Sequence, residues 1–230
     1  MSSWVFLNHK ISSETPLYGD AGNIRITNVR QISKGDTSNN SEIQMPLHSG
    51  THIDAPFHFD AIGKKVSDYS AEFWVFNNIF YIELIVEVGQ IITLPLLEQK
   101  LIEIPQKTEF LIIKTNFEKN RQIDRETYIK HNPGFSPEVG IWLRKNLAIR
   151  ALGFDFISLT SYQNRQLGRI SHRAFLSSVP DGQGNFPFAP VLIVEDMKLS
   201  EISKAPEQVI IAPLLVENAD GVPVTIFAKV

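Results

Sequence analysis

Short apolar runs rich in isoleucine, valine and phenylalanine recur along the chain, and they constrain its fold more than any other feature. Such runs are typical of strands, because β-branched and aromatic side chains suit a pleated, half-buried surface. We predict strands over residues 24–32, 42–47, 80–88, 110–115, 189–194, 209–216 and 224–230. Between the last two, the sequence Glu-Asn-Ala-Asp-Gly at 217–221 predicts a turn.

Helical signals lie in the middle of the chain, between these predicted strands. Residues 136–138, Ser-Pro-Glu, predict a helix start, since serine caps, proline suits the first helical position and glutamate favours the positive helix end. We predict a helix over 136–147, and further helices over 93–102 and 171–177. Strands alternate with helices only in this middle part of the chain, a pattern that is typical of an α/β fold.

Length and composition limit the classes of protein that remain. The 230 residues contain no internal repeat and no linker-like stretch, so we predict a single domain over 1–230. The net charge of −3 offers no basic excess for nucleic acid, and the absence of cysteine excludes disulfides, thiolate metal sites and a cysteine nucleophile. We find no apolar run long enough to span a membrane and no signal-peptide pattern, and we therefore expect a cytoplasmic protein.

Residue types that bind metals are concentrated in one short segment, residues 48–58. Three of the six histidines lie there, at His48, His52 and His58, and Asp54 stands between the last two. Imidazole nitrogen and carboxylate oxygen are the usual ligands of zinc, and they also suit manganese. We predict that His48, His52 and Asp54 bind a divalent metal and leave room for water.

The backbone of this segment is predicted to be extended or turning. His48 and His52 have the four-residue spacing of helical zinc sites, but Gly50 and Pro56 both disfavour a helix interior. In an extended chain alternate side chains share a face, and the four candidate side chains all have even numbers. His58, farther along that face, is then a candidate for proton transfer.

Two other interpretations of these histidines remain open. A lone histidine is more often a solvated surface residue or a satisfied core residue than a ligand. Three histidines and an aspartate, interleaved with glycine, threonine and proline, favour a site instead. A closed structural metal site without catalysis is the second alternative, and an open coordination position holding water would argue against it.

Residues 48–58 resemble the motif His-x-Gly-Thr-His-x-Asp-x-Pro-x-His of the cyclase family, and they match it at every fixed position. That family includes bacterial kynurenine formamidases and isatin hydrolases. The resemblance implies a swivelling β/β/α fold, with mixed sheets and flanking helices, together with a divalent metal site and hydrolysis of a small amide or similar bond. It also implies that His48, His52 and Asp54 bind metal and that His58 is the catalytic proton-transfer group.

The resemblance extends downstream, where the family has a Gly-x-Asp stretch, then a histidine, then a strand glutamate. Residues 153–155, His172 and Glu195 stand in that order here. In two-metal members, the resemblance implies, Asp54 would bridge two ions, with His172 and Glu195 completing the second site. Two features depart from the family pattern: the loop-like residues 179–190 lengthen the gap before Glu195, and the stretch from residue 153 to 159 lacks a Pro-Ser pattern.

We therefore expect a metal-dependent amidohydrolase similar to arylformamidases, with zinc or manganese as the cofactor and one or two ions per chain. Metal-activated water would cleave a carbon–nitrogen bond of a small amide, either an arylformamide or a cyclic amide. A cyclase or lactonase acting on a small ring substrate and a non-catalytic metal-binding protein are the alternatives. The expected partners are a small-molecule substrate and, mainly from the resemblance, further copies of the chain in a homodimer or higher homo-oligomer, with neither nucleic acid nor membrane.

Overall fold

The computed structural model describes residues 3–180, 182 and 184–230. In that part of the chain the strands are β1 (Trp4–Phe6), β2 (Arg25–Arg30), β3 (Asn40–Gln44), β4 (His52–Asp54), β5 (Val75–Phe76), β6 (Ile79–Glu83), β7 (Ile91–Ile92), β8 (Phe110–Lys114), β9 (Gly134–Phe135), β10 (Ala151–Phe154), β11 (Leu192–Glu195), β12 (Gln208–Pro213) and β13 (Gly221–Lys229). The α-helices are α1 (Leu94–Ile102), α2 (Asn120–Ile123), α3 (Arg125–Lys130), α4 (Pro137–Asn146) and α5 (Arg165–Leu176).

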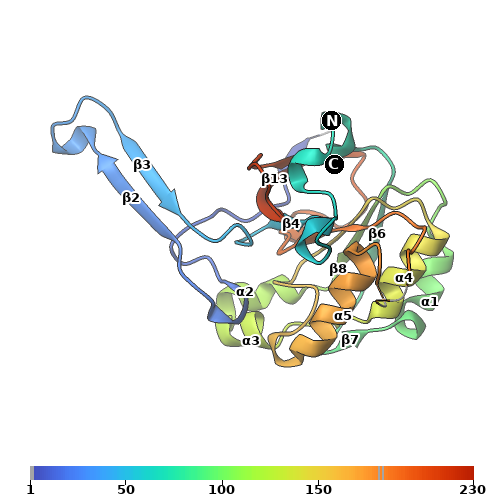
Figure 1. Ribbon diagram of the computed structural model, residues 1–230. Helices are drawn as coiled ribbons and strands as arrows, with labels where there is room; N and C mark the ends of the chain where they lie inside the picture. Colours follow the sequence, from blue (N-terminus) through green and yellow to red (C-terminus); the bar gives the residue numbers. More distant parts are fainter. Residues whose placement is uncertain (1–2, 181, 183) are drawn as a thin grey trace.

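A mixed sheet forms the centre of the fold, with strand order β5-β12-β13-β4-β11-β10-β8-β6 and with β1 paired to β13. Strands β6, β8, β10 and β11 run parallel to their neighbours in this set. Parallel neighbours need crossover connections, and α1, α4 and α5 lie in these connections (Figure 1). Strand β4 pairs antiparallel with both β11 and β13, so it lies where the parallel half of the sheet meets the antiparallel half.

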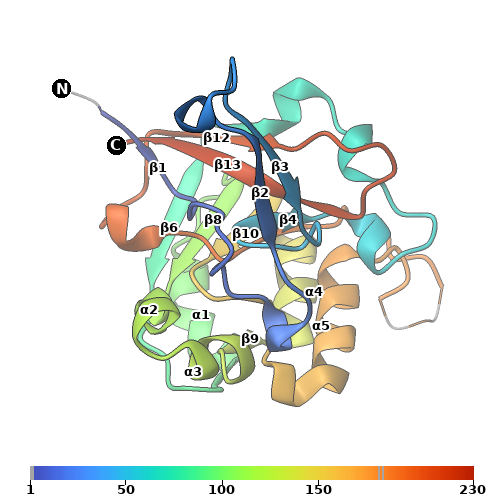
Figure 2. The ribbon, with the colours of Figure 1, turned by 90° about the vertical axis from the view of Figure 1, so that its left-hand side faces the viewer.

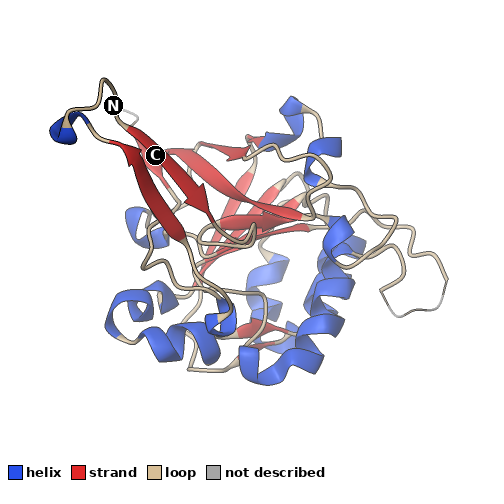
Figure 3. Cartoon of the chain, turned by 60° about the vertical axis from the view of Figure 1, so that its left-hand side comes forward, coloured by secondary structure: helices blue, strands red, loops and turns tan. Residues whose placement is uncertain are grey.

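Two hydrophobic clusters cover the two faces of the parallel strands. In β8, Leu111 and Ile113 join the cluster that contains the apolar faces of the helices, whereas Phe110 and Ile112 join the cluster formed with the antiparallel strands. Alternate side chains of a strand point to opposite faces, so burial on both sides requires the continuous apolar run seen in the sequence. The longer helices gather on one side of the sheet (Figure 3), which confirms the expected α/β fold with β/β/α layers.

Strands β2 and β3 form a hairpin that projects from the body of the molecule (Figures 1 and 2). They pair only with each other among the described strands, with Ile26 opposite Ile43. Every residue of both strands is exposed, the two isoleucines included. An isolated two-stranded hairpin is only marginally stable in water. Because all of its strand residues are exposed, this arm lacks the packing that usually supports such a hairpin.

The elements lie close to where the sequence predicts them, with three differences. The strand predicted over 80–88 ends at Glu83, and beyond it the side chains of Ile85 and Val88 are exposed. The helix predicted over 171–177 begins at Arg165, because the Asn164 side chain caps it. Ser136 precedes α4 as predicted, but its side chain makes no capping hydrogen bond.

The stretch 179–190 contains no helix or strand in its described part, as expected of a loop; Asp181 and Gln183 lie outside the described residues. Within the described chain, no helix has the length and apolar composition needed to cross a membrane.

Candidate metal centre

The segment 48–58 is extended only in β4, where the side chains of His52 and Asp54 reach the same cavity. Before β4, Gly50 has φ +60°, a left-handed conformation that favours glycine and turns the chain. After β4, Pro56–His58 form a single 3₁₀ turn. The prediction of one extended face therefore holds for His52 and Asp54. The two outer histidines reach the same cavity through a bend and a turn, so the segment is partly extended and partly turning, and all four side chains face one cavity.

Strand pairing brings acidic residues from distant parts of the sequence to both sides of β4. Glu195, the last residue of β11, lies opposite His52 in the antiparallel ladder. On the other side, Gly221 of β13 lies opposite Asp54, so Asp220 immediately precedes this pairing. Residues directly opposite in antiparallel strands have neighbouring side chains. The register of the sheet thus determines which carboxylates reach the histidine segment.

His172 reaches the same place from α5. Its Nε2 lies 3.8 Å from Oδ2 of Asp54 and 3.8 Å from Oε1 of Glu195. Its ring stacks on Phe59, with the ring centroids 4.6 Å apart. The structure therefore brings together every residue that the sequence singled out for this site: His48, His52, Asp54, His58, His172 and Glu195.

Three histidines share one arrangement, in which one ring nitrogen bonds to a protein acceptor and the other faces the carboxylates. The hydrogen bonds join Nε2 of His48 to Asp220 at 2.9 Å, Nδ1 of His52 to the Gly50 carbonyl at 2.8 Å, and Nδ1 of His172 to the Gly168 carbonyl at 2.7 Å. The opposite nitrogens of His48 and His52 lie 2.8 Å and 3.6 Å from Oδ1 of Asp54. A histidine that binds a metal uses its second nitrogen in this way, because the hydrogen bond fixes the tautomer and the ring orientation.

Asp54 provides the test of whether a cation fits. Its side chain is fully buried. Oδ1 forms an ion pair with Nδ1 of His48 at 2.8 Å, whereas Oδ2 has no hydrogen-bond partner within the described residues. A buried carboxylate is costly unless positive charge or hydrogen bonds compensate it. A buried carboxylate surrounded by imidazole nitrogens that face it is a donor set that a divalent cation would satisfy.

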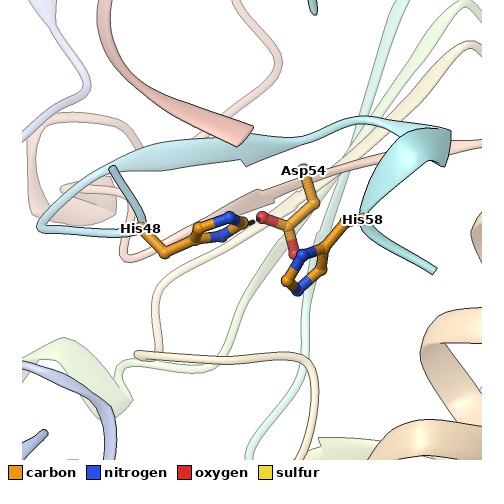
Figure 4. A group of neighbouring side chains, drawn as sticks. All are labelled: His48, Asp54 and His58. Atoms are coloured by element: carbon orange, nitrogen blue, oxygen red, sulfur yellow. Dashed lines mark ion pairs between the residues drawn. The ribbon is translucent and has the colours of Figure 1, made fainter. Parts of the chain in front are cut away.

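Two overlapping sets of donor atoms lie close enough together to hold an ion. In one set, atoms of His48, Asp54 and His58 all lie within 4.8 Å of one another (Figure 4). The other set combines His52 and Asp54 with Glu195. Asp54 belongs to both, as a bridging carboxylate would. His58 therefore lies close enough to His48 and Asp54 to be a ligand. It also lies beside the cluster, where a proton-transfer group is expected.

Without a bound cation, the carboxylates of the site favour protonated imidazoles. Burial lowers the pKa of His48, but Asp54 and Asp220 more than offset that effect and raise it to about 10. The pKa values of His52 and His172 are also raised, since nearby carboxylates outweigh burial. Burial raises the pKa of Asp54, but the histidine charges around it lower that pKa overall. The carboxylates thus favour positive charge at this place.

Asp220 is a site residue that the sequence did not reveal. Its Oδ2 accepts hydrogen bonds from Nε2 of His48 at 2.9 Å and from Nδ1 of His58 at 2.7 Å. These bonds hold the pKa of its carboxyl well below the usual range. From the sequence, Asp220 is predicted only to belong to the turn at 217–221. The sequence feature that could have pointed to this place is the glycine after Asp220. The structure requires Gly221 there, because a Cβ would lie 2.4 Å from Cε1 of His48.

The Gly-x-Asp stretch at 153–155 packs and hydrogen-bonds within the fold, outside the cavity. Gly153 packs closely under Met197, whose sulfur would lie 2.4 Å from an added Cβ. The carboxylate of Asp155 accepts hydrogen bonds from the backbone and the hydroxyl of Thr115, at 2.9 Å and 2.6 Å. Neither residue is among those that line the cavity in the described chain.

The cavity above the cluster has a volume of about 300 Å³. The histidines and carboxylates form one part of its lining, and apolar side chains that include Phe59 and Ile157 form another. Arg165 and Arg169 of α5 complete the lining with Tyr18 and other residues. A cavity of this size and composition suits a small organic molecule.

The Cyclase family model matches residues 5–160, which include the complete 48–58 motif. The chain belongs to the cyclase family, as the resemblance of that motif implied. Kynurenine formamidase of Geobacillus thermodenitrificans is 26% identical over 226 residues, covering 97% of this chain and 96% of that protein. Cyclase-like protein 2 of Arabidopsis thaliana is 25% identical over 225 residues, covering 95% of this chain and 76% of that protein.

Solved structures with the same fold include two isatin hydrolases. Isatin hydrolase A from Labrenzia aggregata, bound to benzyl benzoate, superposes with a TM-score of 0.81 at 21% identity and covers 100% of this chain and 94% of its own. Isatin hydrolase A from Ralstonia solanacearum gives 0.79 at 19% identity, with 100% and 92% covered. At such low identity these likenesses concern the fold, and they confirm the expected fold class.

Proposed function

We propose that this chain is a metal-dependent hydrolase that cleaves a carbon–nitrogen bond of a small amide. The observation that carries the proposal is Asp54, which is fully buried and faces nitrogens of three histidines at an open cavity. Relatives named kynurenine formamidase and fold neighbours named isatin hydrolase support a small amide as the substrate. An open cavity beside the donor cluster favours catalysis over a closed structural site.

The residues that would hold the cation are His48, His52, Asp54, His172 and Glu195. Each of the three histidines directs one nitrogen toward Asp54 or Glu195. Asp54 has one oxygen near His48 and the other near His172, which is compatible with one ion or with two. Nitrogen and carboxylate donors suit zinc or manganese. Such a cation, when bound, polarises the amide carbonyl and lowers the pKa of water from ~16 toward ~7.

His58 is proposed as the group that moves protons. Asp220 bonds to its Nδ1, which leaves Nε2 as the nitrogen available for exchange. In hydrolysis, His58 would take a proton from the water that attacks the carbonyl carbon. It would then return a proton to the nitrogen as the carbon–nitrogen bond breaks, so the products are a carboxylic acid and an amine. Imidazole is suited to both steps because its pKa lies near neutral pH.

The proposed function is tested by metal analysis and by substrate profiling. Protein purified without chelator should contain zinc or manganese, and chelation should abolish hydrolysis of formanilide or of a cyclic amide until metal is restored. A small lactone assayed in parallel distinguishes an amidase from the alternative cyclase or lactonase. Protein that stays metal-free after zinc and manganese are supplied would rule out the proposal.

A homodimer is proposed from a surface feature as well as from the family resemblance. The β2–β3 hairpin projects from the body of its own chain (Figure 1), and Ile26 and Ile43 are exposed at paired positions on it. A second exposed apolar patch, on β1 and β13, contains Trp4, Phe6 and Phe227. A two-fold symmetric dimer can bury two different patches at once, because each copy offers both. We therefore assign a second copy of this chain as the partner of the hairpin.

A further inference from the structure

Two arginines line the cavity beside the proposed metal site. Arg165 and Arg169 are four residues apart in α5, so they lie on neighbouring turns of one helix face. The same helix carries His172 farther along. The two guanidinium groups therefore have a fixed relation to the histidine cluster, because all three side chains come from a single rigid element.

Neither guanidinium has an acidic partner among the described residues, since no carboxylate oxygen lies within 4.0 Å of either group. Arg165 lies instead over the ring of Tyr162, at 5.4 Å from its centroid. Tyr162 in turn packs edge-on against Tyr18, which also lines the cavity. Arg165 thus contacts one aromatic ring, which leaves its hydrogen-bond donors free, and both arginines lie at the exposed rim of the cavity.

Two neighbouring hydroxyl groups belong to the cavity lining. Thr160 is 1% exposed, and its side chain is a hydrogen-bond partner of the Tyr18 hydroxyl. Burial together with the Glu195 charge raises the pKa of Tyr18 to about 12. Tyr18 therefore stays protonated at neutral pH, and this hydroxyl pair adds polar groups to the lining beside the arginines.

We propose that Arg165 and Arg169, assisted by Thr160 and Tyr18, recognise an anionic group on the substrate. The substrate class would then be a small amide with an apolar body and a carboxylate. Phe59 and Ile157 contact the body, the arginines bind the carboxylate, and the amide faces the histidine cluster. Guanidinium suits this task because its planar donors match a carboxylate. The inference rests on the proposed function for the identity of the reacting bond, but the recognition of charge can be measured separately.

The experiment compares matched probes, 4-formamidobenzoate and its neutral methyl ester, together with the 2-isomers of both. Metal-loaded wild-type protein should favour the acid over the ester in kcat/KM. Arg165→Met and Arg169→Met should each reduce that preference about tenfold. A hydrogen bond to a charged group typically changes a binding constant by about this factor. Arg173→Met is the matched control, because Arg173 is exposed on α5 but is not part of the cavity lining, and it should leave the preference unchanged.

Binding by calorimetry on the same metal-loaded proteins separates this inference from the proposed function. If no probe is hydrolysed, the proposed amidase activity fails, while a preference for binding the acid that is lost in the double variant Arg165→Met/Arg169→Met still supports the anion site. Arg165→Lys/Arg169→Lys should restore part of the preference, because the charge remains without the planar donors. Equal binding of acid and ester, or a preference that survives the double Met variant, would overturn the inference.

Discussion

Nδ1 of His58 lies 2.7 Å from Oδ2 of Asp220, although 162 residues separate them in the sequence. The same oxygen accepts the hydrogen bond from Nε2 of His48. One carboxylate therefore orients a proposed metal ligand and the proposed proton-transfer group together, and the ring centroids of the two histidines lie 4.3 Å apart. The chemistry of the site thus depends on a residue that lies far outside the 48–58 motif in the sequence.

Asp220→Asn should weaken metal binding while the protein stays folded. The amide cannot accept both imidazole hydrogen bonds with the strength of a carboxylate, and loss of such a supporting partner reduces metal affinity by about 10–100-fold. The measurement is a competition titration with a chromophoric chelator. Glu217→Gln, an exposed carboxyl residue of the same turn, is the matched control. Unchanged affinity in Asp220→Asn would assign Asp220 to turn structure alone.

His58→Ala should retain the metal and lose turnover. General acid–base groups contribute roughly 10²–10⁴-fold to rate, whereas a ligand contributes to affinity. Metal content and kcat are measured together, with His52→Ala as the comparison that should lose metal. If metal content in His58→Ala falls in step with kcat, His58 is a ligand, as its closeness to His48 and Asp54 would also allow.

Metal binding should release protons. The pKa of His48 is raised to about 10 by Asp54 and Asp220 in the absence of metal, so this ring carries a proton at neutral pH. A metal ligand must be deprotonated, so affinity should increase as pH rises from 6 to 8. Calorimetric titration in buffers of different ionisation enthalpy counts the protons. Metal uptake with no net proton release would contradict the charged state of His48.

Asp155→Asn should stabilise the protein above pH 6. Burial raises the pKa of Asp155 to about 6 from 3.8, so its contribution to stability is present at low pH and is lost as pH rises through 6. A shift of this size corresponds to about 3 kcal/mol, and an amide imitates the neutral acid. Denaturant unfolding at pH 4 and pH 8 gives the two free energies, with Glu217→Gln as the exposed control. Equal destabilisation of Asp155→Asn at both pH values would refute this explanation.

Substitution of the hairpin isoleucines should dissociate the proposed dimer. Light scattering on wild-type protein should give twice the chain mass of 26.0 kDa, and Ile26→Asp/Ile43→Asp should give the chain mass once. Charges at the centre of an apolar contact oppose burial. Ile85→Asp is the matched control, because Ile85 is 89% exposed outside the hairpin. A wild-type protein that scatters as a single chain would eliminate the dimer.

Much of the architecture could be predicted locally. The run 110–115 becomes β8 and the signals at 136–138 start α4, because apolar periodicity and helix-start chemistry act over a few residues. Strand ends were less predictable. The run 80–88 stays apolar beyond Glu83, yet the strand stops there, because its ladder partner β8 ends at the paired residue Lys114. Pairing length is a property of two strands, and one strand's sequence does not contain it.

The sequence by itself determined the donor chemistry, since His48, His52, Asp54 and His58 fall within one segment whose residue types favour a metal. Only the tertiary structure decided how these groups meet and which others join them. The register of β4 with β11 carries Glu195 to His52, and the register of β4 with β13 carries Asp220 to the outer histidines. These pairings join residues far apart in the chain, and the burial of two faces of a whole sheet selects them rather than any local preference.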